Sequence, residues 1–166
     1  MWSHAHAMIP QMHIDVLVAR GLEGSPKRTW LKDVARRVLL AEGVDNAEME
    51  LVITSSEKVR DLNRDYRGLD EPTDVLAFAA TEQAVGAPPF VGPPGETRHL
   101  GEVIIAYPEA MGQAAEHHHP VEQEMALLII HGILHLLGYD HDEPKAESRM
   151  RGREKEILAA VLGGRD

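Results

Sequence analysis

The chain has 166 residues, which suits one domain with a sizeable core. It contains no cysteine, so disulfides, thiolate nucleophiles and cysteine-based metal sites are excluded. The formal net charge of −10 argues against an extended non-specific nucleic-acid surface, which needs many Lys and Arg contacts to phosphates. A bound divalent cation with a local basic patch could still attract an anion to one cleft.

No apolar run of about 18 residues predicts a membrane span. Residues 1–11 lack the basic and apolar regions of a secretory signal. We therefore expect a cytoplasmic protein with no membrane partner. Residues 1–12 are predicted to be a disordered extension, native or added for expression, and residues 13–166 a single domain.

Hydrophobic periodicity and turn residues predict the elements in chain order. Strands are predicted at 13–20, 48–54, 74–79 and 100–107, and helices at 27–42, from Ser55 or Ser56 to about 66, at 108–117, 120–137 and 143–162. The Gly- and Pro-rich segment 81–99 is predicted to be an exposed loop near the sheet edge. This order indicates one α+β domain, a small mixed sheet of about four strands packed with about five helices. The apolar run 125–137 predicts a buried central helix.

The strongest chemical pattern is HGILHLLGYDH at residues 131–141. His131 and His135 are four residues apart, so a helix places both imidazoles on one face, one turn apart. Gly138 then ends the helix, and the chain turns so that His141 can approach from a third direction. Three nitrogens leave one tetrahedral position open, as in catalytic zinc sites. The alternative is two buried histidines bonded to neighbouring groups and a surface His141.

Other histidines have plainer interpretations. The run 117–119 stands at a predicted helix end, where consecutive side chains diverge. It is interpreted as a solvated helix terminus or as a favourable interaction with the C-terminal dipole. His13 and His99 are read as surface residues in the same way. Gly132 stands where the HExxH metalloproteases carry their glutamate base, so a zinc peptidase becomes the weaker alternative.

Three arginines, Arg60, Arg64 and Arg67, recur at spacings that share one helical face. Acidic residues interleave with them at pairing distance, and on spacing alone an ordinary salt-bridged surface helix is favoured.

The segments LNRDYRGLDEPTDVLAF (62–78) and HGILHLLGYDH, with LGEVIIAY between them, resemble the YbeY family of bacterial endoribonucleases and rRNA maturation factors. The resemblance covers nearly the whole chain after about residue 13. It implies one zinc ion per chain held by His131, His135 and His141, and a functional role for Arg67. It also implies cleavage of single-stranded RNA in 16S 3′-end maturation and ribosome quality control. The implied partners are rRNA in ribosomal particles and ribosomal or assembly-factor proteins.

The sequence departs from the family pattern at two positions. Ala77 stands where the family usually has a serine, and Glu102 where an aspartate is common. Arg67 is expected to bind a non-bridging phosphate oxygen. Proton transfer is left open between the coordinated water, Glu102 and Asp140, and the attacking group between water and the RNA 2′-OH. A non-catalytic ribosome assembly factor with a stabilising zinc is the second alternative.

Overall fold

The computed structural model describes residues 11–80, 97–139 and 143–163. Residues 1–10 of the predicted N-terminal extension and most of the loop at 81–99 lie outside these ranges. Gln11 and Met12, predicted to belong to the extension, instead begin the first strand. The strands are β1 (Gln11–Val18), β2 (Asn46–Thr54), β3 (Val75–Ala79) and β4 (Arg98–Ala106). The helices are α2 (Arg28–Ala41), α3 (Ser56–Arg67), α4 (Tyr107–Glu116), α5 (Val121–Leu136) and α6 (Pro144–Gly163).

The sheet has the order β1-β2-β4-β3 and is mixed. β1 runs parallel to β2, and β2 runs parallel to β4, whereas the edge strand β3 is antiparallel to β4. The α+β class, the four-stranded mixed sheet and the five helices predicted from periodicity are confirmed for the described residues. Most element boundaries differ from the predictions by one or two residues, the usual uncertainty at helix and strand ends.

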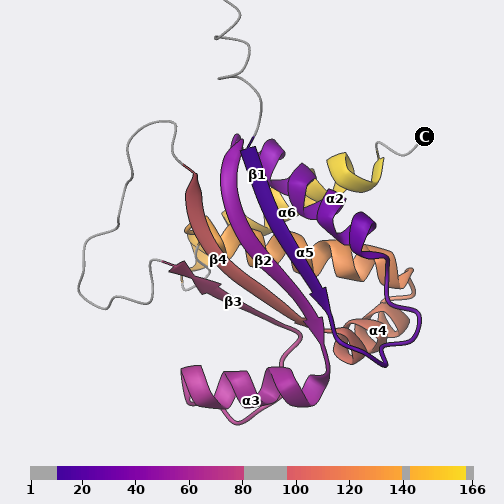
Figure 1. The fold of residues 1–166 in the computed structure, drawn as a ribbon. Coiled ribbons are helices and arrows are strands. Elements are labelled where there is room, and N and C mark those ends of the chain that lie inside the picture. The colour runs from indigo at the N-terminus through magenta and orange to yellow at the C-terminus, as the bar shows by residue number, and fades with distance from the viewer. Residues whose placement is uncertain (1–10, 81–96, 140–142, 164–166) are drawn as a thin grey trace, which may run out of the picture.

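Helix α5 is the central helix, as its apolar sequence predicts. Ten of its sixteen residues are buried, and it packs against α2, α4, α6 and the strands β3 and β4. Figure 1 shows α2, α5 and α6 together behind the sheet. Helix α5 approaches the sheet closely at Gly132, because a methyl group there would lie 2.5 Å from Cγ1 of Val103 on β4.

Helix α3 lies on the opposite face of the sheet. Successive side chains of a strand point to opposite faces, and β4 shows this directly. Val103 and Ile105 belong to the main core with α5, whereas Ile104 and Ala106 form a smaller cluster with Val59 of α3. The sheet therefore separates α3 from α5.

A bulge in β4 decides which face its side chains occupy. The register with β2 shifts between Glu48 and Met49, which pair with His99 and Gly101 and leave Leu100 as the extra residue. Gly101 has φ +123°, and a methyl group there would collide with the Phe78 carbonyl oxygen. Leu100 and Val103 consequently both face the main core, although strict alternation would put them on opposite faces.

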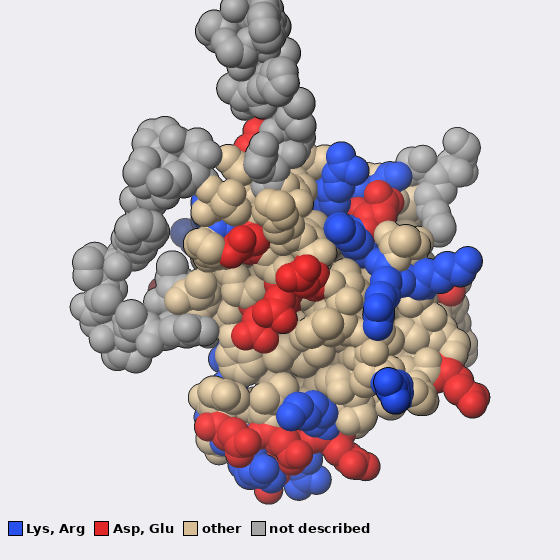
Figure 2. Space-filling view, viewed as in Figure 1, with Lys and Arg blue, Asp and Glu red and all other residues tan. Residues whose placement is uncertain are grey.

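The α3 face of the sheet is open beyond that helix. Figure 2 shows acidic side chains gathered over the strands on this face. A shallow depression there is lined by Asp15, Glu48 and Glu50 of β1 and β2, with Glu102 of β4 at its border. Within the described ranges, no helix combines the length and apolar character needed to cross a membrane.

Candidate functional site

His131 and His135 lie side by side on one face of α5. Their Nε2 atoms are 3.2 Å apart, and the two rings meet edge to face with centroids 4.6 Å apart. Two ligands of a tetrahedral zinc ion, each about 2.0–2.1 Å from the metal, are separated by roughly 3.3 Å. The pair is therefore spaced as two nitrogens on one ion would be, which agrees with the predicted helical spacing.

Glu154 of α6 orients His131 from the opposite side of the ring. Its Oε2 lies 3.0 Å from Nδ1 of His131, and its side chain is 16% exposed. A carboxylate at Nδ1 favours a proton on that nitrogen, which leaves the lone pair on Nε2 for a metal. The sequence analysis missed Glu154, because it lies 23 residues away along the chain and only the packing of α6 on α5 brings it close.

The end of α5 turns as predicted. Gly138 has φ +101°, and the amides of Gly138 and Tyr139 donate to the carbonyls of His135 and Leu134. This closes the helix by a left-handed turn. The third predicted ligand, His141, and the candidate acid–base residue Asp140 lie outside the described residues, so the structure brings together two members of the predicted triad.

A partly buried hydrogen-bond network holds Tyr139, the residue that precedes this segment. The Tyr139 hydroxyl donates to Oε1 of Glu42 over 2.7 Å, and Nε of Arg153 donates to Oε2 over 2.5 Å. The hydrogen bond to Glu42, together with burial, raises the pKa of Tyr139. The ends of α2 and α5 and the middle of α6 are joined at this point.

Arg67 occupies a pocket on the α3 face. Its guanidinium donates to the Ala77 carbonyl oxygen over 2.7 Å and lies 5.2 Å from the centre of the Phe78 ring. The Ala77 side chain packs towards the main core, so its backbone makes this contact and not its side chain. The cavity, about 490 Å³, is lined by Leu62, Tyr66, Arg67, Phe78, Ala79, Glu102 and Ile104.

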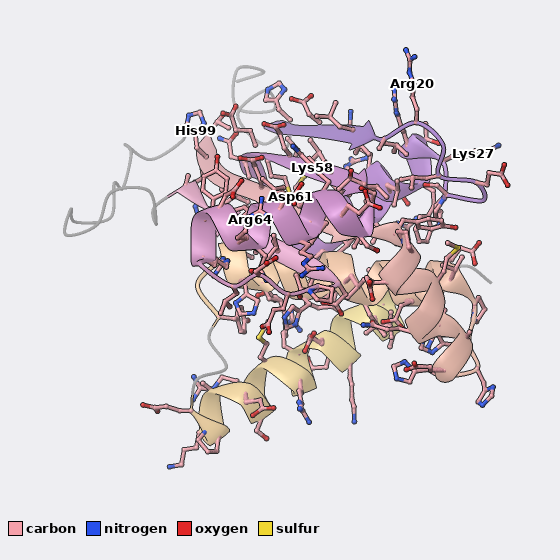
Figure 3. The ribbon with its side chains drawn as sticks, turned by 90° about the horizontal axis from the view of Figure 1, so that it is seen from below. Arg20, Lys27, Lys58, Asp61, Arg64 and His99 are labelled. Carbon is pink, nitrogen blue, oxygen red and sulfur yellow. The ribbon has the colours of Figure 1, made fainter. Side chains whose placement is uncertain are left out.

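The two other arginines of α3 behave as a salt-bridged surface would. Arg64 pairs with Asp61 and Asp65, and these contacts raise its pKa. Arg60 pairs with Asp70. Figure 3 shows Lys58, Asp61 and Arg64 following one another along the outer side of α3. Arg67 differs, because its guanidinium donates to a backbone carbonyl and faces a pocket.

The predicted site residues thus fall on two faces of the sheet. Arg67 and Glu102 line one pocket on the α3 face, whereas His131 and His135 project from α5 on the other. The edge strand β3 contacts both helices and separates the two groups. Glu102 lines the same pocket as Arg67, on the face of the sheet opposite the two histidines.

The prediction that the side chains of residues 117–119 diverge is wrong for His117 and His119, although α4 does end at this point and His117 is exposed. His117 Nδ1 lies 3.5 Å and His119 Nε2 lies 2.6 Å from the same oxygen, Oε1 of Glu124. The three ligand atoms lie within 4.8 Å of one another, so this group could hold a metal ion. The side chains converge because the chain reverses at His118, which has φ +56°.

Comparison with known proteins identifies the family to which the chain belongs. A family profile described as Endoribonuclease YbeY matches residues 21–162. The chain belongs to the YbeY family. An Endoribonuclease YbeY from Dehalococcoides mccartyi is 47% identical over 148 residues, covering 86% of each chain. One from Moorella thermoacetica is 43% identical over 139 residues, covering 83% of this chain and 88% of the relative.

One solved structure has a similar fold. The solution structure of TM1509 from Thermotoga maritima is 25% identical, has a TM-score of 0.59, and covers 93% of this chain and 91% of its own. The resemblance to YbeY inferred from the two motif segments is confirmed.

Proposed function

We propose that this chain is a zinc-dependent endoribonuclease of rRNA maturation, acting on single-stranded RNA, with residues 13–166 as one catalytic domain. Membership of the YbeY family supports RNA cleavage as the reaction. The observation that carries the proposal in this molecule is the histidine pair. Two Nε2 atoms lie 3.2 Å apart, and one ring is held at Nδ1 by a carboxylate.

The donors present fit zinc. His131 and His135 supply nitrogen ligands, which zinc prefers to bind, and His141 is proposed as the third. When bound, the ion supplies Lewis-acid chemistry, lowering the pKa of water towards neutrality and withdrawing charge from a phosphoryl oxygen. Glu154 holds the His131 ring in the required orientation and tautomer.

Arg67 is proposed to hold the RNA backbone. Its guanidinium can offer paired donors to a non-bridging phosphate oxygen, at the cost of its bond to the Ala77 carbonyl. The acidic strands of the open sheet face repel phosphates, which directs an RNA strand towards the β3 edge. An RNA strand that crosses the β3 edge would run from the Arg67 pocket towards the histidines of α5.

Glu102 and Asp140 are proposed as the groups that move a proton. Glu102 is half-buried in the Arg67 pocket, where it can accept a proton from a hydroxyl positioned beside the guanidinium. Asp140 precedes the third ligand in the chain. Comparing the pH dependence of cleavage in Glu102→Gln and Asp140→Asn variants assigns the role, because the residue that carries it removes one limb of the profile.

The structure argues against peptide hydrolysis by the HExxH route. The position that would carry the glutamate base is Gly132, which is buried and faces Val103 of β4. A carboxylate there would be buried against valine methyl groups, where an unpaired charge is strongly unfavourable.

The test uses two variants and two measurements. Arg67→Ala should keep its zinc content and lose cleavage of a single-stranded RNA, whereas His135→Ala should lose both cleavage and one zinc per chain. Elemental analysis and gel-based cleavage report the two quantities. Unchanged cleavage in His135→Ala overturns the proposed enzyme. Ribosome association that survives in a non-cleaving His131→Ala variant would support an additional assembly role.

A further inference from the structure

A second group of metal-binding side chains lies at the turn between α4 and α5. His119 Nε2 and His117 Nδ1 both approach Oε1 of Glu124, at 2.6 Å and 3.5 Å. The Glu124 side chain is 5% exposed and that of His119 17%, whereas His117 is 58% exposed. The group therefore has a buried floor and one ligand open to solvent.

The backbone at this turn takes an unusual conformation that makes the convergence possible. His118 is the only residue other than glycine with a positive φ in the described ranges. The amides of His118 and His119 donate to the carbonyls of Ala115 and Ala114, which ends α4 in a tight reversal. The left-handed conformation is unfavourable for a non-glycine residue. The reversal that it makes brings the rings of His117 and His119 to the same side.

The carboxylate of Glu124 favours a cation. It stands in the first turn of α5, where the helix dipole stabilises a negative charge. The charged partners that the structure records for it are the two histidines, with no Lys or Arg among the described residues. A nearly buried carboxylate beside two imidazoles supplies the nitrogen and oxygen donors that zinc, cobalt and nickel ions accept.

Gln123 lies where it can hydrogen-bond the ring nitrogen of His119 that faces away from the ion, as partners of metal-bound histidines usually do. Its side-chain amide lies 3.3 Å from Nδ1 of His119. The amide oxygen and nitrogen can exchange places by a rotation of the group. With the oxygen towards the ring, Gln123 accepts the Nδ1 proton and leaves the Nε2 lone pair of His119 for an ion.

We infer that His117, His119 and Glu124 form a second site for a divalent transition-metal ion of the zinc class. Seven residues separate Glu124 from His131, or roughly 10 Å along the helix axis. One ion cannot serve both groups, since zinc–ligand distances are about 2.0–2.2 Å. For both atoms to bind one tetrahedral ion, the distance between Nε2 of His119 and Oε1 of Glu124 must increase by less than about 1 Å. The ion clamps the end of α4 to the start of α5.

Zinc equilibrium dialysis of the full chain tests this site independently of RNA cleavage. The His135→Ala variant, which disables the other histidine pair, should retain one zinc per chain. The double variant His135→Ala/His119→Gln should retain none. His135→Ala/His118→Gly is the matched control; it removes an imidazole from the same turn without removing a ligand, and should still retain one.

Two outcomes overturn the site: His135→Ala without zinc in saturating metal, or zinc that persists unchanged after His119→Gln. A second variant guards against a folding defect. His117→Ala alters an exposed side chain, so circular dichroism should be unchanged while zinc affinity, measured in the His135→Ala background, falls at least about tenfold. Equal affinity with and without His117 would also contradict the assignment.

Discussion

The two ends of α5 carry histidine groups built in different ways. Near the C-terminal end, His131 and His135 belong to one rigid helix, and a glutamate from α6 orients one of them. At the N-terminal end, the histidines come from a turn, and the helix supplies the carboxylate. The regular geometry of a helix fixes the spacing of its side chains, whereas the spacing of side chains in a turn depends on the particular backbone angles of that turn. The first group was therefore visible in the sequence, and the second was not.

The C-terminal group depends on tight packing of α5 against the sheet. Gly132→Ala should lower the free energy of unfolding by about 1–3 kcal/mol, because the added methyl overlaps Val103 and overpacking has that magnitude. Gly112→Ala is the control, since a methyl on α4 there meets nothing within 4 Å and alanine favours the helix. Urea unfolding of both variants compares them. Equal stabilities would show that α5 can move away from β4.

Glu154→Gln should weaken zinc at His131 and His135 about 10- to 100-fold, the usual effect of losing a carboxylate behind a ligand. Competition with a chromophoric chelator, in a His119→Gln background, isolates this site. Glu147→Gln alters an exposed pair with Arg151 on the same helix and should leave the affinity unchanged. An unaltered affinity in Glu154→Gln would remove α6 from the site.

The turn at the other end should respond in the opposite sense. His118→Gly should raise the free energy of unfolding of the metal-free protein by about 0.5–1 kcal/mol. Glycine adopts a positive φ without steric strain, and this gain exceeds the loss caused by the greater entropy of glycine in the unfolded chain. At about 2–4 °C per kcal/mol, the shift is measurable by thermal unfolding. His118→Val should lower the midpoint. A lower midpoint for His118→Gly would mean that the imidazole itself stabilises the turn.

The smallest effect concerns Tyr107 at the start of α4. Burial, and then the charge of Glu122, raises the pKa of Tyr107. The folded state thus favours the neutral phenol. The contribution of the neutral phenol to the free energy of unfolding is complete below the pKa of tyrosine in the unfolded chain, about 10. It is lost as the pH rises through the higher pKa of the folded state. The melting temperature of Tyr107→Phe should fall less than that of wild type between pH 9.5 and 11. Parallel curves would contradict this.

Local patterns were sufficient for the secondary structure, the central helix and the histidine pair, because each depends on residues within a few turns of one another. Glu154 could not be found in this way, since its role depends on how α6 crosses α5. Arg67 was indistinguishable by spacing from Arg60 and Arg64, and only its position beside β3 separates it from them. His117 and His119 were misread because their convergence depends on the conformation of His118.

The bulge in β4 gives that strand a particular vulnerability to deletion. The extra residue at Leu100 reverses the alternation, so that Glu102 faces the Arg67 pocket and Leu100 the main core. Removing one residue here would exchange inside and outside for every position on one side of the cut. A frame-preserving loss of a single codon in this strand would therefore be more damaging than most substitutions. Length, as much as residue identity, is under constraint in β4.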